Sequence, residues 1–531
     1  MNKDRKEIET KTIVEWFLNL YLLALLPFYL FTFLPSAAHA QGERFLRYNC
    51  IAPSSLSPLL GELEGASAPS SPVQGAPRVA RLPDIRSQWD STRIYPVAVI
   101  LVQFADKKFS VEDPIDRYNR MFNEEGYNEG AGPGCVAEYF RTQSSGLFNP
   151  RFDIYGPINV STNCTANGTY GQTTFRNATL LLADSLHADL TPYDWDGDGR
   201  VESIVFIYAG YGGNESANKD KGYIWPNTGS FATLTLDQGQ VLHYSASAEL
   251  WSNDTSCGIG TICHEYSHTL GIPDIYPTGS SEYSVCDEWD LMDGGNFINN
   301  GWCPPNYSPH QKMQLNWLTP EVLDEPATIQ GLKPIAKGGK AFIIPTEAAN
   351  EFYLLENRQW NNWDLRIPGH GLLIYHIDYS QNAWDGNNVN SNPDHHRYDI
   401  FHADNLNYAQ WDSLIEGNPH RGGHSLLLSG TAYPLVCDSA ENRQLTDEST
   451  PAAMTFCGSG LLSKPITAIR EADDGTISFH FMGGDPSCIR LIGNDKPHNK
   501  WNSLRDLQGR PVTSPKRKGL YILEGKKYIH H

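Results

Sequence analysis

The feature that most constrains the fold of this chain is the sequence HEYSHTLGIPD, which begins at His264. His264 and His268 stand four residues apart, so a helix places both imidazoles on one face. Gly271 and Pro273 then end that helix and allow the backbone to fold back. We expect this return to bring Asp274 close to the two histidines.

These residue types at this spacing have the chemistry of a zinc site that activates water. Two imidazoles and one carboxylate leave the fourth position of a tetrahedral zinc open. Glu265 projects about 100° further round the helix than His264, which directs its carboxylate to a water beside the metal instead of the metal itself. We therefore predict that zinc binds to His264, His268 and Asp274, and that Glu265 is catalytic.

Glu288 is the alternative candidate for the third ligand. It would reach a metal held by His268 only from a helix that runs through residues 285 to 290. The local sequence CDEWDLMDGG is instead typical of a strand or loop that enters a turn, which favours Asp274.

The sequence WDLMDGG contains a second feature of such sites. Met292 precedes Gly294 and Gly295 and stands where metzincin-like peptidases carry a methionine turn beneath the zinc. The alternative is an ordinary buried methionine before a glycine turn. Its position soon after the histidine motif favours the methionine turn.

Several segments together resemble the immune inhibitor A family of secreted bacterial zinc metallopeptidases. They are HEYSHTLGIPD, WDLMDGG and SPHQKMQLNWL, the upstream YPVAVILVQFADKKF, CVAEYFRTQSSGLF and DWDGDGRVESIVFIYAGYG, and the downstream EFYLLENRQW, PGHGLLIYHID and PITAIREADDGTISFHF. The resemblance spans residues 94 to 483 and is most specific at the histidine motif. It implies a metzincin-like fold, zinc on His264, His268 and Asp274, and Glu265 as the catalytic residue.

The sequence DWDGDGRVE has the pattern of a calcium-binding loop. Asp194, Asp196 and Asp198 alternate along it, and the Arg200 carbonyl can add another oxygen ligand. Glu202, at the ninth position, takes the place of the carboxylate that calcium loops carry at the twelfth. We expect a structural calcium ion here; the alternative is a solvated Asp-Gly turn that binds no metal.

Residues 1–40 have the features of a secretory signal peptide. A charged start precedes an apolar run from Ile13 to Leu34, and Ala38-His39-Ala40 then offers a small-residue cleavage site. The alternative is an uncleaved anchor, because the run approaches the length of a membrane span. We predict cleavage, no stable membrane span afterwards, and a location outside the cell or at its surface.

Charge and cysteine content narrow the possible partners and compartment. The formal net charge is −20 with both signs spread along the chain, and there is no basic groove, so no nucleic-acid partner is expected. The 10 cysteines fit an oxidising compartment. Candidate disulfides join Cys286 to Cys303 and Cys437 to Cys457.

Helices and strands mix without a regular βαβ repeat, which favours the α+β class, here a metzincin-like zinc peptidase domain followed by a β-rich domain. The predicted parts are a signal peptide (1–40), a pro-segment or linker (41–93), a zinc metallopeptidase domain (94–318), a β-rich domain packed on the catalytic domain (319–485) and a small basic C-terminal tail (486–531).

Periodicity also predicts individual elements. Helices are expected at 113–124, 136–143 and 175–188, and strands at 96–104, 151–155 and 202–208. The active-site helix should start after Asp254, Thr255 or Ser256, any of which could cap it. In the β-rich domain we expect loop residues, not metal ligands, at His395, His396 and His402.

These patterns predict a secreted zinc-dependent endopeptidase that acts on proteins or peptides. Zinc-activated water attacks the peptide carbonyl, and Glu265 carries a proton to the leaving amine. Tyr276, Tyr283 or His310 could donate a hydrogen bond to the oxyanion. The alternative is a secreted binding or adhesion protein with a structural or vestigial zinc site, against which Glu265 argues because a structural site does not need it.

Overall fold

The computed structural model describes residues 89–484, apart from gaps at 187–188, 216, 219, 232–233, 237–238, 279–283, 407–427 and 438–439, and the strands at 488–490, 504–505, 519–523 and 526–530. These residues belong to one compact unit, Arg47–His531. The predicted signal peptide and almost all of the predicted pro-segment lie outside the described residues. Among the helices that are described, none is both long and apolar enough to cross a membrane.

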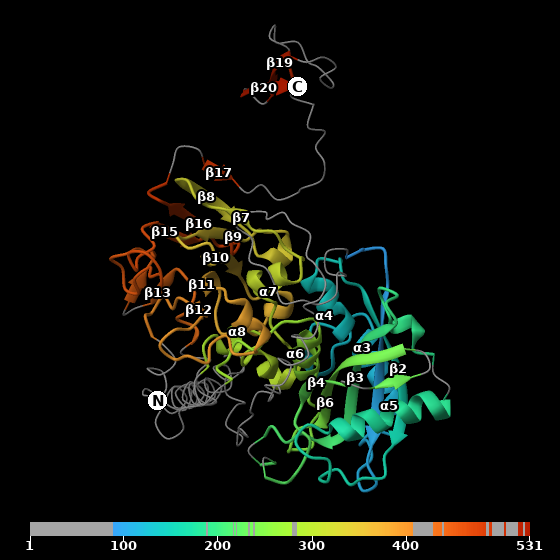
Figure 1. Ribbon diagram of the computed structural model, residues 1–531. Helices are drawn as coiled ribbons and strands as arrows, with labels where there is room; N and C mark the ends of the chain where they lie inside the picture. The colour runs from blue at the N-terminus through green and yellow to red at the C-terminus, as the bar shows by residue number, and fades with distance from the viewer. Residues whose placement is uncertain are drawn as a thin grey trace, which may run out of the picture. The chain divides into compact units, whose positions relative to one another are not determined.

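The first sheet has the strand order β2-β1-β3-β6-β4 (Figure 1). Neighbours from β2 to β6 are parallel, whereas β4 pairs antiparallel with β6 at the edge. The apolar run YPVAVILVQ forms β1 and is buried along almost its whole length, as expected for a strand covered on both faces. The strands are β1 (Tyr95–Gln103), β2 (Pro150–Asn159), β3 (Arg200–Tyr211), β4 (Asn227–Ser230), β5 (Thr235–Leu236), which pairs with β6, and β6 (Gly239–Leu250).

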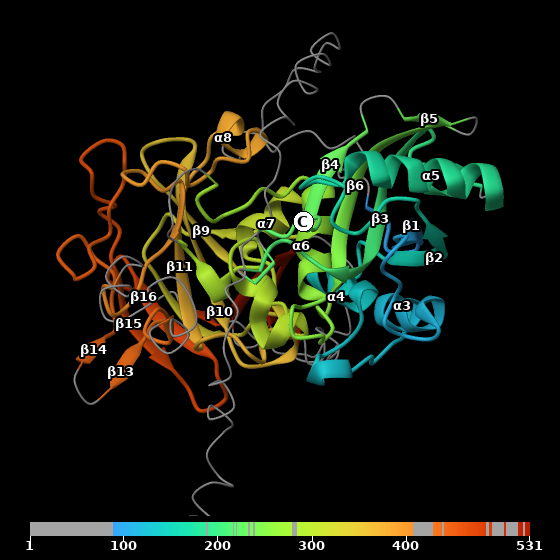
Figure 2. The same ribbon diagram turned by 90° about the horizontal axis from the view of Figure 1, so that it is seen from below.

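Helices cover both faces of this sheet, with α5 on one side and α3 and α4 on the other (Figure 2). Val99 of β1 packs in a core with residues of α3, α4 and α6, whereas its neighbour Ile100 packs in a core with residues of α5. The α-helices are α3 (Pro114–Asn123), α4 (Val136–Gln143), α5 (Gln172–Leu186), α6 (Gly260–Thr269) and α7 (Pro309–Gln314), and the 3-10 helices are η4 (Glu129–Ala131), η5 (Thr191–Tyr193), η6 (Asp287–Trp289) and η7 (Gly295–Gly301).

A five-stranded sheet of order β12-β11-β10-β9-β7 and a four-stranded sheet of order β15-β16-β8-β17 follow. All eight residues of β10 are buried. Phe352 and Leu354 pack in the core that contains α6, whereas Tyr353 and Leu355 pack in a core with residues of the four-stranded sheet. This one strand is therefore shared by two hydrophobic cores.

The elements of this part are β7 (Glu321–Val322), β8 (Ala327–Leu332), η8 (Ile335–Lys337), β9 (Phe342–Pro345), β10 (Glu351–Arg358), η9 (Asn362–Asp364), β11 (Gly371–Asp378), α8 (Gln381–Asp385), β12 (Tyr398–Ile400), β13 (Leu435–Cys437), β14 (Ala440–Asn442), β15 (Ile466–Glu471), β16 (Ile477–Phe481) and β17 (Cys488–Arg490). Strands β13 and β14 pair with each other, and a three-stranded sheet is formed by β18 (Leu504–Arg505), β19 (Gly519–Leu523) and β20 (Lys526–His530).

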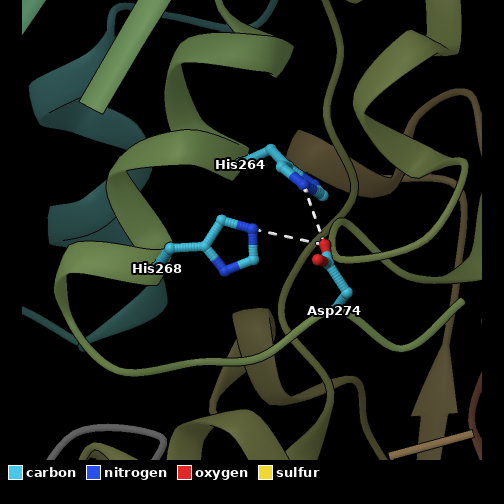
Figure 3. Close-up of side chains that lie close together, drawn as sticks. All are labelled: His264, His268 and Asp274. Atoms are coloured by element: carbon cyan, nitrogen blue, oxygen red, sulfur yellow. Dashed lines mark ion pairs between the residues drawn. The ribbon is translucent and has the colours of Figure 1, made fainter. Parts of the chain in front are cut away.

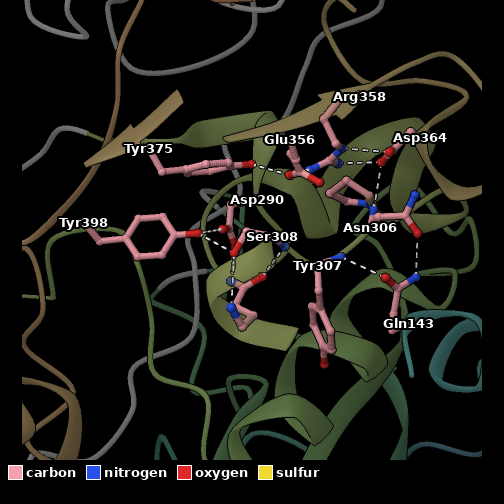
Figure 4. A network of polar contacts seen from close by, with 12 residues as sticks. Gln143, Asp290, Asn306, Tyr307, Ser308, Glu356, Arg358, Asp364, Tyr375 and Tyr398 are labelled. Carbon is pink, nitrogen blue, oxygen red and sulfur yellow. Dashed lines mark hydrogen bonds and ion pairs between the residues drawn. The ribbon is translucent and has the colours of Figure 1, made fainter. Parts of the chain in front are cut away.

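A buried polar network connects α4 to β10 (Figure 4). Gln143, at the end of α4, donates to Asn306 (2.8 Å) and accepts from the backbone N–H of Tyr307 (2.9 Å). The Asn306 N–H donates to Asp364 (2.9 Å), and Arg358 of β10 donates from Nε to the same carboxylate (2.7 Å). Because breaking a buried network leaves polar groups without partners, it holds these elements in register.

The mixture of helices and strands confirms the expected α+β content, and α4 coincides with the helix predicted at 136–143. The predicted start of the active-site helix is wrong. Helix α6 begins at Gly260, and Ile259 precedes it without a side-chain cap. The three expected caps lie in a reverse turn at the end of β6, in which the Trp251 N–H donates to the Thr255 carbonyl (2.8 Å) and Leu250 pairs with Ser256.

The predicted disulfides are also wrong. Cys286 and Cys303 are both free thiols, and Cys457 is a free thiol too, so it forms no disulfide with Cys437. Cys286 and Cys303 are fully buried, and the Cys303 thiol donates to the Trp363 carbonyl (3.5 Å). Burial raises the pKa of Cys303 to about 12. These two thiols therefore behave as small apolar core residues.

Candidate metal centre

Helix α6 carries His264, Glu265 and His268 and is buried along nearly its whole length. Its first turn packs closely on η7, since a Cβ on Gly260 would lie 2.1 Å from the Asn296 carbonyl oxygen. Only glycine fits this approach without a shift of the backbone. The close packing fixes the direction in which the two histidines project.

The end of α6 orients the second histidine. Gly271 has a φ of 86°, its N–H donates to the His268 carbonyl (2.8 Å), and the Ile272 N–H donates to the Ser267 carbonyl (3.2 Å). This is the Schellman pattern that ends many helices at glycine. The Ile272 carbonyl then lies 2.8 Å from Nδ1 of His268. The turn that stops the helix and leads to Asp274 therefore also holds an imidazole in place.

The two histidines and the aspartate converge as the motif predicts (Figure 3). Nε2 of His264 and Nε2 of His268 each lie 3.2 Å from Oδ1 of Asp274. Two ligands that are about 2.0–2.2 Å from a tetrahedral zinc stand roughly 3.3 Å apart, so these three atoms can share one ion. The side chains of His264 and Asp274 have no exposed surface, and that of His268 is 6% exposed.

Backbone carbonyls select the nitrogen that each ring presents. Nδ1 of His264 lies 2.8 Å from the Leu291 carbonyl oxygen, and a carbonyl can only accept. In both histidines, Nδ1 therefore carries a hydrogen, and Nε2 is the nitrogen that faces the cluster and can ligate a metal. The next residue, Met292, is fully buried, and its carbonyl accepts the Ile275 N–H (2.8 Å). The turn at Met292 thus contacts the loop that carries Asp274.

The charges of the cluster stabilise one another. Burial alone raises the pKa of Asp274, but His268 and His264 outweigh it and hold that pKa well below its usual value. Burial likewise lowers the pKa of His268, whereas Asp274 outweighs it and leaves that pKa above its usual value. The carboxylate is therefore ionised at neutral pH and available to a cation.

Glu265 is 1% exposed and contacts the edge strand of the first sheet. The Thr228 hydroxyl, on β4, lies 2.7 Å from the Glu265 carbonyl oxygen and 3.1 Å from its Oε2. One side chain of β4 thus restrains both the backbone and the carboxylate of this residue.

The alternative third ligand and the candidate oxyanion donors lie in other parts of the chain. Glu288 is in η6 and, among the described residues, does not join the histidines in a group that could hold a metal. Tyr276 follows the Asp274 loop, and Tyr283 lies outside the described residues. His310 is buried on α7 beside Phe352 and Trp384, with ring centroids 6.1 and 5.4 Å away, and burial lowers its pKa to about 3.

The loop before β3 and the start of that strand bring together Asp194, Asp196 and Glu202. Their carboxylates form the other group in the described part of the chain that could hold a metal. Asp198 is outside this group, and its Oδ1 accepts the backbone N–H of Arg200 (2.8 Å). The structure therefore gathers three of the four carboxylates predicted for calcium.

Backbone groups of the same loop hold these carboxylates. Asp194 accepts the N–H groups of Gly197 (2.7 Å) and Gly199 (2.8 Å), and both oxygens of Glu202 accept the Trp195 N–H (2.9 Å). Gly197 and Gly199 have φ values of 77° and 86°, which glycine adopts without strain. Burial raises the pKa of Glu202 to about 8.

The histidines of the β-rich region have separate partners. Within the described residues they join no group that could hold a metal. The pairs are His395 with Asp378 (2.8 Å), His396 with Asp399 (3.5 Å) and His402 with Thr431 (2.8 Å).

Two residues that contact the centre carry no signal in the sequence. Thr228 lies 37 residues before Glu265, and Asn387, which bonds to Asp274, lies 113 residues after it. Neither belongs to a motif, so only the folded structure shows these contacts.

Comparison with known proteins agrees with the sequence resemblance. No family model matches the chain. Immune inhibitor A of Bacillus thuringiensis subsp. alesti is 25% identical over 309 residues, which are 49% of this chain and 43% of that protein. The chain thus spans less than half the length of this curated relative. It is similar to immune inhibitor A, as the segments around the histidine motif predict.

Proposed function

We propose that this chain is a secreted zinc-dependent endopeptidase in which His264, His268 and Asp274 bind zinc and Glu265 is the general base. The observation that carries the proposal is the 3.2 Å distance from each imidazole Nε2 to one carboxylate oxygen. Further support comes from Glu265 on the same helix and from the similarity to immune inhibitor A.

The residues of the site have distinct roles in this mechanism. His264, His268 and Asp274 would hold the zinc, which would supply a Lewis acid for the scissile carbonyl and lower the pKa of a water to about 7. Glu265 accepts a proton from the attacking water and delivers it to the leaving amine. Thr228 restricts the orientation of this carboxylate. The carbonyls of Leu291 and Ile272 keep both Nε2 atoms facing the site.

We also propose that calcium binds to Asp194, Asp196 and Glu202. Carboxylate oxygens are the ligands that calcium prefers, and the three lie close together where the loop enters β3. The ion would tie the loop to this strand and so would have a structural role. The substrates we propose are proteins or peptides outside the cell.

The test of the peptidase proposal uses Glu265→Gln with Glu288→Gln as its matched control. We expect Glu265→Gln to retain zinc but to lose about 10²–10⁴-fold in kcat/KM, because the proton carrier is removed. Glu288→Gln should retain both zinc and activity, because Glu288 lies outside the cluster. Casein digestion measures activity, and metal analysis measures zinc.

A chelator should abolish digestion, and added zinc should restore it. Full activity of Glu265→Gln would contradict the assigned base. Loss of zinc from Glu288→Gln would show instead that Glu288 is a ligand. If a zinc-loaded wild-type sample cleaves no protein, the binding or adhesion function replaces the peptidase.

A further inference from the structure

The predicted third ligand is held by a side chain from a distant part of the chain. Asn387 follows α8 and lies 113 residues after Asp274. Its Nδ2 donates to Oδ2 of Asp274 (2.7 Å), and its Oδ1 accepts the backbone N–H of Asp274 (2.7 Å). Because a carboxylate cannot donate and an N–H cannot accept, the two bonds fix the orientation of the amide.

Neighbouring contacts hold Asn387 against the Asp274 loop. The Asn387 carbonyl accepts the Thr278 hydroxyl (2.6 Å), and Asn390 donates to the Ile275 carbonyl (2.8 Å). Asn387 has a φ of 51°, a left-handed conformation that asparagine adopts more readily than most residues. The segment after α8 is therefore shaped to lie along the loop that carries Asp274.

We infer that Asn387 is a positioning residue that makes Asp274 bind the metal through Oδ1 alone. This inference rests on the proposed zinc site. Oδ1 is the oxygen that lies 3.2 Å from both imidazole nitrogens, while Asn387 occupies Oδ2. A carboxylate that ligates through one oxygen leaves a tetrahedral zinc one position for water. Partners of this kind orient metal ligands and tune their affinity.

The three ligands differ in what orients them. Nδ1 of His264 and Nδ1 of His268 each face a backbone carbonyl, which a point mutation leaves in place. The carboxylate of Asp274 is oriented by the side chain of Asn387, which a point mutation can remove. Asn387 is therefore the place where ligand orientation can be changed while every ligand is kept.

Asn387→Asp tests the inference, because it keeps the shape of the side chain but turns the donor into a second carboxylate beside Oδ2. The expected change is a zinc affinity about 10–100-fold weaker than that of the wild type. Asn388→Asp is the matched control, since Asn388 is exposed and the change in charge and shape is the same. Its zinc affinity should stay within about twofold of the wild type.

The measurement is the zinc dissociation constant of the full chain, obtained by competition with a chromophoric chelator at one pH and ionic strength. The visible spectrum of the cobalt-loaded protein provides a second readout. If Asp274 binds through both oxygens once Asn387 is changed, the intensity of the cobalt bands should fall, because five-coordinate cobalt absorbs more weakly than four-coordinate cobalt. A role confined to folding would leave this spectrum unchanged.

Asn387→Gly provides a second variant that accommodates the left-handed backbone and adds no charge. Weaker zinc binding in both Asn387 variants, with the melting temperature of the metal-free chain unchanged, would support the inference. Zinc affinity equal to that of the wild type in Asn387→Gly would overturn it, even if Asn387→Asp failed to fold. Absence of zinc binding by the wild type would instead overturn the proposed metal site.

Discussion

The centre on α6 and the acidic loop before β3 both bring metal-binding side chains together, but different parts of the chain hold their carboxylates in place. In the acidic loop, N–H groups a few residues away hold the carboxylates, as Gly197 and Gly199 do for Asp194. At the centre on α6, Asn387 holds Asp274 from 113 residues away. The loop can therefore form from local interactions, whereas the centre forms only when distant segments have folded together.

The carboxylates of the two sites also differ in their electrostatic environment. Two buried imidazoles hold the pKa of Asp274 well below its usual value, whereas burial raises the pKa of Glu202 to about 8. The first carboxylate is ionised before any metal arrives. The second favours its neutral form until a cation offsets the burial. Preorganisation for a metal is therefore stronger at the centre on α6.

The largest expected effect that separates the two sites is on zinc affinity. His268→Asn removes one of the three proposed protein ligands. Zinc binding to four-ligand sites is worth about 10–16 kcal/mol, or about 3 kcal/mol for each ligand. We therefore expect affinity to fall roughly a hundredfold or more. Asp196→Asn, in the acidic loop, should leave zinc binding unchanged. Chelator competition measures both variants, and equal zinc losses would mean that the two sites are not independent.

A smaller effect is expected on the free energy of unfolding when calcium is added. If calcium binds the acidic loop, calcium at a hundred times its dissociation constant should raise the free energy of unfolding by about 2.7 kcal/mol. The double change Asp194→Asn and Asp196→Asn should abolish that increase and leave zinc-dependent proteolysis intact. Urea unfolding with and without calcium measures the increase. The same increase in the double variant would place the calcium elsewhere.

The smallest effect is expected at Met292. Met292→Leu nearly conserves volume, so it should cost less than about 1.5 kcal/mol of stability. Zinc affinity should not change, because it is the carbonyl of Leu291 that faces Nδ1 of His264. Urea unfolding and zinc titration of the same variant measure both quantities. A large fall in zinc affinity would show that the methionine side chain itself orients the site.

The sequence allowed prediction of those parts of the centre that depend on neighbours along the chain. The four-residue spacing of His264 and His268 and the glycine at 271 determined the convergence on Asp274, because helix geometry and a left-handed turn are local. The start of α6 was not predictable in this way. The helix begins where Gly260 lies against η7, a contact between distant segments that no local pattern signals.

The roles of Thr228 and Asn387 illustrate the same limit. Both are common residue types without a motif, and their partners lie 37 and 113 residues away. The spacing of Cys286 and Cys303 was equally uninformative, since both are buried as free thiols in the core. Spacing along the chain predicts bonding only where the intervening backbone has a regular geometry.

Strand β10 lies between the two cores, with Phe352 in one and Tyr353 in the other. Partial unfolding of the four-stranded sheet would expose one face of β10 and loosen its neighbour β11, whose chain continues through α8 to Asn387. If zinc binds as we propose, its release would then indicate unfolding of the four-stranded sheet, which contributes no ligand. Slow dissociation of zinc would then be an early sign of partial unfolding, measurable before the helical content of the chain falls.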